Sequence, residues 1–258
     1  MDYINKIPML VMLVIALCSF KADTTGPWIQ TSRENITLFT RPIRYSTSNS
    51  PDSTAISQII LEQNRVIDSI NIILNVKFDK KVEIFLFNQN EATTKLGTEN
   101  GGFCDSRKNR IYFAFGTSLD QEKPVEKTFF VGMHEMAHII AHNEIGWAKT
   151  RLMREGLANA IDGTYGKEAI SKWMNGYIKN NLIVSPKELL ADTDLPDRVF
   201  YPQSGYFTKW LIMKYGIEKI KEIYISNSRE FVLHFEKITG DSFESMNEKY
   251  LHYCTTFN

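Results

Sequence analysis

The stretch GMHEMAHIIAH, residues 132–142, constrains the fold more than any other part of the sequence. Residues four apart on an α-helix project from nearly the same face, so His134 and His138 can direct two imidazole rings at one metal ion. Glu135 stands beside that face, where its carboxylate can take a proton from a water molecule. Apolar residues surround this HExxH pattern, and burying several ionisable groups without partners is costly. The sequence therefore predicts a metal site on a largely buried helix.

The expected ion is zinc, because two imidazoles and a carboxylate suit it and a catalytic site keeps a fourth position for water. His142 is a poor third ligand, since it lies roughly 12 Å from His134 along a straight helix. We expect it beside the ligands or at the surface. A site of the form HExxHxxGxxH is excluded by spacing, because Ala141 stands three residues after His138 and is followed directly by His142.

Glu155 is the better third ligand, in the segment REGLANAID. Thr150 fits a helix start and Gly163 a helix stop, and Gly146 ends the preceding helix, so the second helix follows after a short connection and can lie against the first. The neighbours of Glu155 on this helix are apolar or small, which disfavours a helix that faces only solvent. They are Leu152, Leu157, Ala158 and Ile161.

Composition excludes some classes of protein. The chain has 258 residues, of which 43% are hydrophobic and 12% aromatic, enough to bury a substantial core. The 30 basic and 30 acidic residues cancel, and no long run of lysine and arginine could follow a phosphate backbone. A disordered chain is therefore disfavoured, and we expect no nucleic-acid partner.

The N-terminus resembles an export signal. Lys6 precedes the uncharged, mainly apolar stretch 7–20, which is shorter than the about 20 apolar residues of a membrane span. We expect residues 1–22 to be a signal peptide and the protein to be exported: secreted, periplasmic or associated with the envelope. Attachment to the membrane stays open, either through an uncleaved signal anchor or through a lipid on Cys18, although Leu17 is bulkier than the residue that usually precedes a lipidated cysteine.

Cys104 and Cys254 would remain after removal of the signal. An oxidising compartment permits a disulfide between them, but spacing alone cannot fix its geometry. A Cys104–Cys254 disulfide and two unpaired cysteines both stay open.

The pattern of segments predicts an α+β fold. In residues 23–145 strands are expected over 36–45, over 82–87, and as a hairpin over 101–115 around the turn SRKN, with a helix after residue 53. From Pro124 onward the character becomes helical, and we expect residues 146–258 to form a mainly helical subdomain that carries the third ligand.

HEMAH followed by EGLA resembles the gluzincin metallopeptidases, and more closely the small peptidase MA-like families in which HExxH precedes an EGxA helix. The stretch 201–216, YPQSGYFTKWLIMKYG, is also similar to an aromatic helix of that group. The resemblance implies a zincin-like α+β fold, with a small mixed or antiparallel sheet and the active-site helix in the N-terminal half. It implies one zinc ion bound by His134, His138 and Glu155, with Glu135 as the general base that hydrolyses peptide or protein substrates.

The oxyanion that forms during amide hydrolysis needs a further donor. Tyr201, Tyr206 and His234 are candidates, and the resemblance favours Tyr201. A peptide substrate would lie extended along a sheet edge, which a strand of the 101–115 hairpin could supply.

One departure from the thermolysin-like pattern is Asn159, which replaces an aspartate that usually orients a ligand histidine. An amide oxygen can accept the same hydrogen bond but raises imidazole basicity less. Two alternatives therefore stay open beside a peptidase: a non-catalytic zinc-binding or structural protein, and a zinc hydrolase of a non-peptide amide.

Overall fold

In the computed structural model of the chain, the N-terminal half contains a β-sheet, and successive side chains along each strand point to opposite faces of it. The structure describes residues 27–40, 53–88, 102–115, 132–166, 168–191, 194–227 and 229–256. Within these residues the sheet has the order β1-β2-β3-β5-β4. Its strands are β1 (Ile29–Arg33), β2 (Ile36–Thr40), β3 (Val82–Asn88), β4 (Gly102–Asp105) and β5 (Arg110–Phe115). The three central strands run parallel, whereas β1 and β4 pair antiparallel at the two edges.

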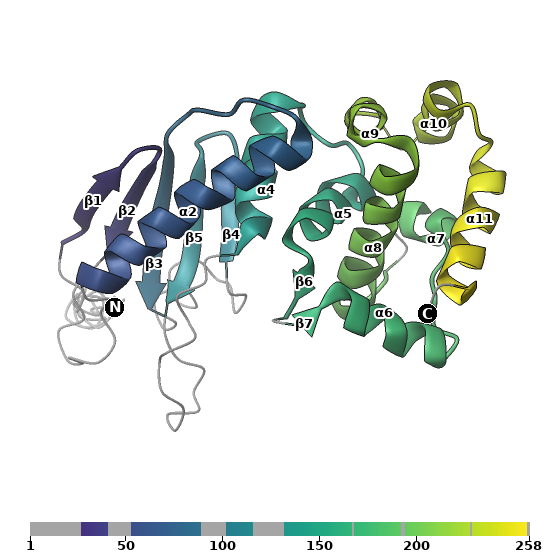
Figure 1. The fold of residues 1–258 in the computed structure, drawn as a ribbon, viewed down its shortest axis with the longest axis horizontal. Coiled ribbons are helices and arrows are strands. Elements are labelled where there is room, and N and C mark those ends of the chain that lie inside the picture. The colour runs from purple at the N-terminus through teal and green to yellow at the C-terminus, as the bar shows by residue number, and fades with distance from the viewer. Residues whose placement is uncertain are drawn as a thin grey trace, which may run out of the picture.

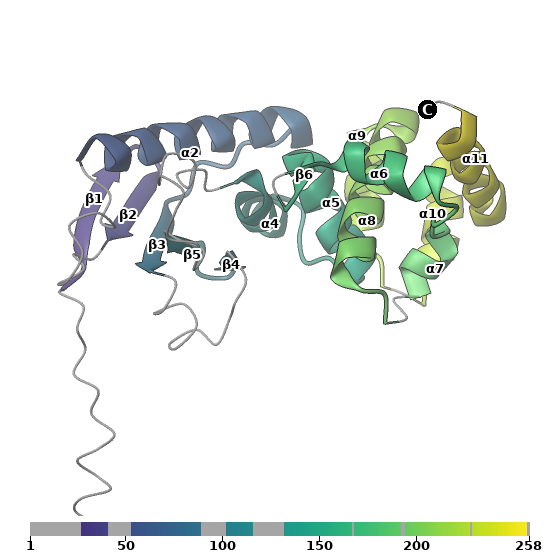
Figure 2. The same ribbon diagram turned by 90° about the horizontal axis from the view of Figure 1, so that it is seen from below.

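Helix α2 (Ser53–Leu74) covers one face of this sheet (Figures 1 and 2). Leu38, Ile84 and Ile111 stand directly opposite one another on neighbouring strands, and each is 0% exposed. The helix predicted after residue 53 is confirmed, and it contributes apolar residues at helical spacing to the same core. Those most deeply buried are Ile59, Ile60, Ile67, Ile70 and Leu74.

The predicted strand over 82–87 and the predicted hairpin over 101–115 are confirmed, with a turn at 106–109 between β4 and β5. The strand expected over 36–45 is present as β2, and its remaining residues lie outside the described part of the chain. Strand β1 was not predicted, because the segment before Asn35 carries little alternation of apolar residues.

The chain after β5 is mainly helical, and the predicted α+β class is confirmed (Figure 1). The elements are α4 (Met133–Glu144), α5 (Arg151–Asp162), the short strands β6 (Thr164–Tyr165) and β7 (Glu168–Ala169), α6 (Ile170–Lys179), α7 (Pro186–Ala191), α8 (Asp197–Tyr215), α9 (Ile217–Tyr224), α10 (Phe231–Thr239) and α11 (Phe243–Thr256). The division of the chain into subdomains at 145/146 stays a prediction.

Helix α5 begins and ends where the sequence predicts. Its N-cap Thr150 accepts a hydrogen bond from the backbone N–H of Met153, and Gly163 ends it with a φ of 73°. Close packing on α8 then depends on two glycines. A Cβ on Gly156 would collide with Thr208 Oγ1, and a Cβ on Gly205 would lie 2.6 Å from Cβ of Asn159.

Two N-terminal predictions, the signal peptide over 1–22 and the lipid on Cys18, lie outside the described residues. None of the helices within the described ranges has the length and apolar character that crossing a membrane requires. Cys104 lies in β4 and Cys254 lies in α11, and no disulfide joins them. Of the two alternatives left open by the sequence, the structure therefore shows the one without a disulfide.

The α5–α8 contact yields a stability prediction. Gly156→Ala should lower the free energy of unfolding by about 1–3 kcal/mol, because the added methyl group overpacks the interface. Gly176→Ala is the matched control, since Gly176 lies inside α6 and a Cβ added there would meet no atom within 4 Å. It should raise stability by about 0.5–1 kcal/mol through helix propensity. Urea unfolding followed by circular dichroism measures both, and equal effects of the two substitutions would contradict the packing argument.

Candidate metal centre

The helix with the two histidines is held in place by the end of the next helix. Gly132, the N-cap of α4, has no side chain to cap the first turn. Asp162 supplies this cap instead, since its Oδ1 accepts a hydrogen bond from the backbone N–H of Met133 over 2.9 Å. Met136, Ile139 and Ile140 face the core on one side of α4 and are 0% exposed. The side with the histidines is thereby turned toward α5.

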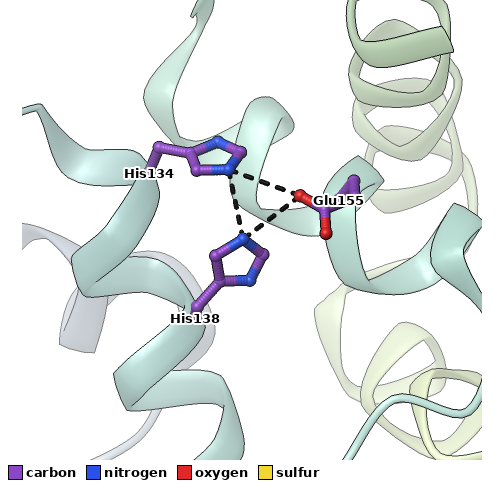
Figure 3. A group of neighbouring side chains, drawn as sticks. All are labelled: His134, His138 and Glu155. Carbon is purple, nitrogen blue, oxygen red and sulfur yellow. Dashed lines mark hydrogen bonds and ion pairs between the residues drawn. The ribbon is translucent and has the colours of Figure 1, made fainter. Parts of the chain in front are cut away.

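Three donor atoms converge between α4 and α5 (Figure 3). Nε2 of His134 lies 3.1 Å from Nε2 of His138. One carboxylate oxygen of Glu155, Oε2, lies 3.4 Å from the first of these nitrogens and 3.2 Å from the second. The rings of the two histidines are perpendicular, with centroids 4.7 Å apart. Glu155 is 7% exposed.

These distances fit a tetrahedral metal ion. Ligand atoms about 2.0–2.1 Å from a tetrahedral zinc ion lie about 3.3 Å from one another, which is close to the three separations in the structure. A neutral imidazole can present one nitrogen lone pair and a carboxylate presents oxygen lone pairs, so these three side chains can act together as ligands of one cation. His134, His138 and Glu155 therefore form a set of donors that suits Zn²⁺.

Interactions within this group of side chains keep the Glu155 carboxylate ionised. Burial alone would raise the pKa of Glu155, but hydrogen bonds with His134 and His138, together with Arg154, hold it far below its ordinary value. Burial likewise works to lower the pKa of His134, and the carboxylates of Glu155 and Glu135 outweigh burial and raise it. Arg154 donates from Nε to the other oxygen of Glu155 over 2.8 Å. The carboxylate therefore stays ionised and fixed in orientation.

Glu135 lines one cleft of about 630 Å³ together with His134, His138 and Glu155. Strand β4 forms one wall, where the thiol of Cys104 lies against the Glu135 carboxylate. Burial, followed by the negative charge of Glu135, raises the pKa of this thiol. The cleft thus lies where the edge of the sheet meets the two helices, and it is large enough for part of a peptide.

The three candidates for the oxyanion donor lie in different places. Tyr201 lines the cleft, with its ring centroid 6.1 Å from that of His134. Burial and the charge of Glu155 raise its pKa to about 12, so its hydroxyl stays protonated. Tyr206 instead packs on Tyr253, with ring centroids 6.0 Å apart. His234 bonds to Ser226 over 3.0 Å and lines a separate hollow.

His142 lines the cleft but is outside the group of converging donors, as expected from its spacing. Its ring meets that of Trp147 edge-on, at 5.2 Å between centroids. Asn159 is 2% exposed and packs toward α8, and within the described residues no hydrogen bond joins it to His134 or His138. The residue that fixes the start of α4 is Asp162, seven positions after Glu155.

Sequence reasoning missed Tyr224, which is 2% exposed and lines the cleft from the end of α9. Burial and the charge of Glu155 raise the pKa of its phenol. Cys104 was considered only for a disulfide, and Arg154 was not considered. No spacing rule could have found Tyr224, because helix packing alone brings α9 to the cleft.

No protein-family model matches the sequence, and no curated protein matches it. Among solved structures, the chain is similar to a mutant M1 zinc metallopeptidase from Deinococcus radiodurans bound to a Tyr-Ser-Ala substrate, with a TM-score of 0.42 and 11% identity, over 90% of this chain and 51% of that one. A mutant two-domain M1 zinc metallopeptidase bound to L-tryptophan has a TM-score of 0.42 and 14% identity, over 90% and 50%. The chain thus spans about half the length of these proteins.

The geometry predicts how zinc binding responds to substitution. The protein purified without added metal should hold about one zinc ion per chain, and Glu155→Ala should weaken binding by at least about 100-fold, because it removes one of three ligands. His142→Ala is the control, since His142 lies in the same cleft outside the donor group, and it should leave zinc binding unchanged. Elemental analysis and competition with a chelator measure both. Equal zinc in the wild type and Glu155→Ala would place the third ligand elsewhere.

Proposed function

We propose that the protein is a zinc-dependent metallopeptidase of gluzincin type, which hydrolyses peptide bonds with Glu135 as general base. The observation that carries this proposal is the convergence of two histidine nitrogens and the Glu155 carboxylate in a cleft that Glu135 also lines. A zincin-like organisation belongs to the same proposal, with β4 and α4 forming one side of the cleft and the helices from α5 onward forming the other.

A bound zinc ion supplies a Lewis acid to the scissile carbonyl group and to the attacking water. Glu135 takes a proton from that water and delivers it to the nitrogen of the leaving amine. Two observations support this role: Glu135 directly follows His134, and it lines the cleft near Cys104 of β4. The Cys104 thiol lines the same cleft and lies near this carboxylate.

Tyr201 is the donor that we propose for the developing oxyanion. Its ring lies beside His134 and stacks on Tyr165, with centroids 5.6 Å apart. The guanidinium group of Arg151 lies 5.5 Å from the centre of the Tyr201 ring. These contacts hold the phenol in one orientation, and its raised pKa keeps a proton available for donation.

Substrate binding along the edge of the sheet completes the proposal. Strand β4 is an edge strand within the described residues, and Phe103, Cys104 and Asp105 on it line the cleft. An extended peptide can pair with the unpaired backbone groups of such an edge. Export through the signal peptide over 1–22 and the division into subdomains at 145/146 are parts of the same proposal and rest on the sequence.

Glu135→Gln tests the general base. The substitution keeps the size of the side chain but removes its basicity, so hydrolysis of a diverse peptide library should fall by at least about 100-fold. Zinc content should stay at the wild-type level, because Glu135 is outside the group of three donors. Peptide hydrolysis that survives in Glu135→Gln would remove Glu135 from this role. A wild-type protein that holds zinc and cleaves no peptide would favour a non-catalytic zinc-binding protein.

Tyr201→Phe tests the oxyanion donor. Loss of one such donor should lower kcat by about 100- to 1,000-fold while KM changes little. Tyr206→Phe is the matched control, since it removes the same hydroxyl group five residues along the same helix, where the ring packs on Tyr253 away from the cleft. It should leave kcat within about twofold of the wild-type value. Steady-state kinetics on one cleaved peptide measure both variants, and equal losses would contradict the assignment.

A further inference from the structure

One row of aromatic side chains crosses the sheet on the face opposite to α2. Phe39, Phe85, Tyr112 and Phe103 occupy directly opposed positions on β2, β3, β5 and β4. Successive ring centroids along this row lie 4.5, 5.2 and 4.7 Å apart, and the interplanar angles are 4°, 17° and 18°. We call these four residues the aromatic row.

The spacing of the strands explains the stacking. Neighbouring strands lie about 4.7–4.9 Å apart, so rings that stand on opposed residues and point the same way stack face to face with a slight offset. Phe85 and Tyr112 have a ring on each side and are half-buried. Phe103 ends the row on β4 and is 37% exposed. One face of its ring therefore has no ring of this row beside it.

Phe103 also belongs to the wall of the cleft that contains His134, Glu135 and Glu155. Its neighbour Cys104 points to the other face of the sheet, toward Glu135. A peptide bound along β4 would therefore have the proposed catalytic groups on one face of the sheet and the aromatic row on the other face. A peptide paired with β4 would place alternate side chains into each.

We propose that the substrate is an extended peptide with an aromatic side chain at the residue opposite Phe103, which stacks on the exposed face of that ring. The inference rests on the proposed function and extends it to a substrate class. A peptide strand paired with β4 lies one strand spacing from it, so its side chain opposite Phe103 falls at the next position of the aromatic row. An aromatic ring in that position gains the offset stacking that an aliphatic side chain lacks.

The backbone of β4 holds Phe103 in this place before a substrate arrives. A Cβ on Gly102 would lie 2.8 Å from the ring of Phe113 and 3.1 Å from the carbonyl oxygen of Tyr112, so only glycine lets β4 pack this closely on β5. The stack with Tyr112 fixes the ring itself. Because little freedom remains to be lost on binding, the exposed face of Phe103 is a preorganised surface.

Binding and hydrolysis should be measured separately. The probes are fluorescent hexapeptides on a Gly-Ala background, in which each position in turn carries Phe, Leu or Arg. Zinc-loaded Glu135→Gln protein reports binding by fluorescence anisotropy, and the wild-type protein reports hydrolysis. At one position of the hexapeptide, the peptide with Phe should bind about 2- to 10-fold more tightly than the peptide with Leu. In the wild type the same position should show the same preference in kcat/KM.

Substitutions at Phe103 test whether its ring causes the preference for Phe over Leu. Phe103→Leu keeps an apolar side chain of similar size and should reduce the Phe-over-Leu ratio to about one. Phe103→Trp should keep or increase the ratio. Phe39→Leu removes a ring from the other end of the aromatic row, and should leave the ratio unchanged even where it lowers stability. Circular dichroism of each variant establishes that the fold is retained.

The outcomes separate the two proposals. Aromatic-selective binding that Phe103→Leu abolishes, without hydrolysis in the wild type, supports the subsite and contradicts the peptidase. Hydrolysis with no position that prefers Phe contradicts the subsite and leaves the peptidase standing. A preference that persists in Phe103→Leu, or one for Arg alone, overturns the subsite, and absence of binding by every peptide overturns it as well.

Discussion

Glu155 is 7% exposed, and its carboxylate lies between the imidazoles of His134 and His138. The surrounding packing must keep these three side chains together. Burial of an ion costs several kcal/mol unless partners are fixed around it. The partners of Glu155 are His134 and His138 on α4 and Arg154 on its own helix. Since these groups come from two helices, α4 and α5 must be held at one separation and in one register.

Neighbouring elements supply that register. Asp162 caps the first turn of α4 from the end of α5, so the two helices are joined at one end by a hydrogen bond as well as by packing. On the other side of α5, Gly156 and Gly205 let α8 approach closely. The same approach brings Tyr201 from α8 into the cleft. Gly156, the neighbour of Glu155, therefore also determines where Tyr201 on α8 lies.

The edge of the sheet gives the cleft its second wall. Because side chains alternate along β4, Cys104 faces Glu135 while Phe103 continues a row of stacked rings on the opposite face. The cleft therefore joins a polar centre, rich in ionisable groups, to the exposed ring of Phe103 on β4. This combination suits the proposed binding of an extended peptide, in which backbone pairing gives affinity and alternate side chains give specificity.

Local patterns in the sequence determined the helix that carries His134 and His138, the start and stop of α5 at Thr150 and Gly163, and the hairpin of β4 and β5, because helix period, capping and turn chemistry act over a few residues. The order of parallel strands, and the arrival of Tyr224 and Asp162 at the centre, were decided only by tertiary packing. Tertiary packing also brings Tyr201, but not Tyr206 or His234, to the cleft, and it leaves Cys104 and Cys254 without a disulfide between them. Contacts between residues far apart in the chain depend on how whole helices and strands bury their apolar faces together, and no local spacing contains that information.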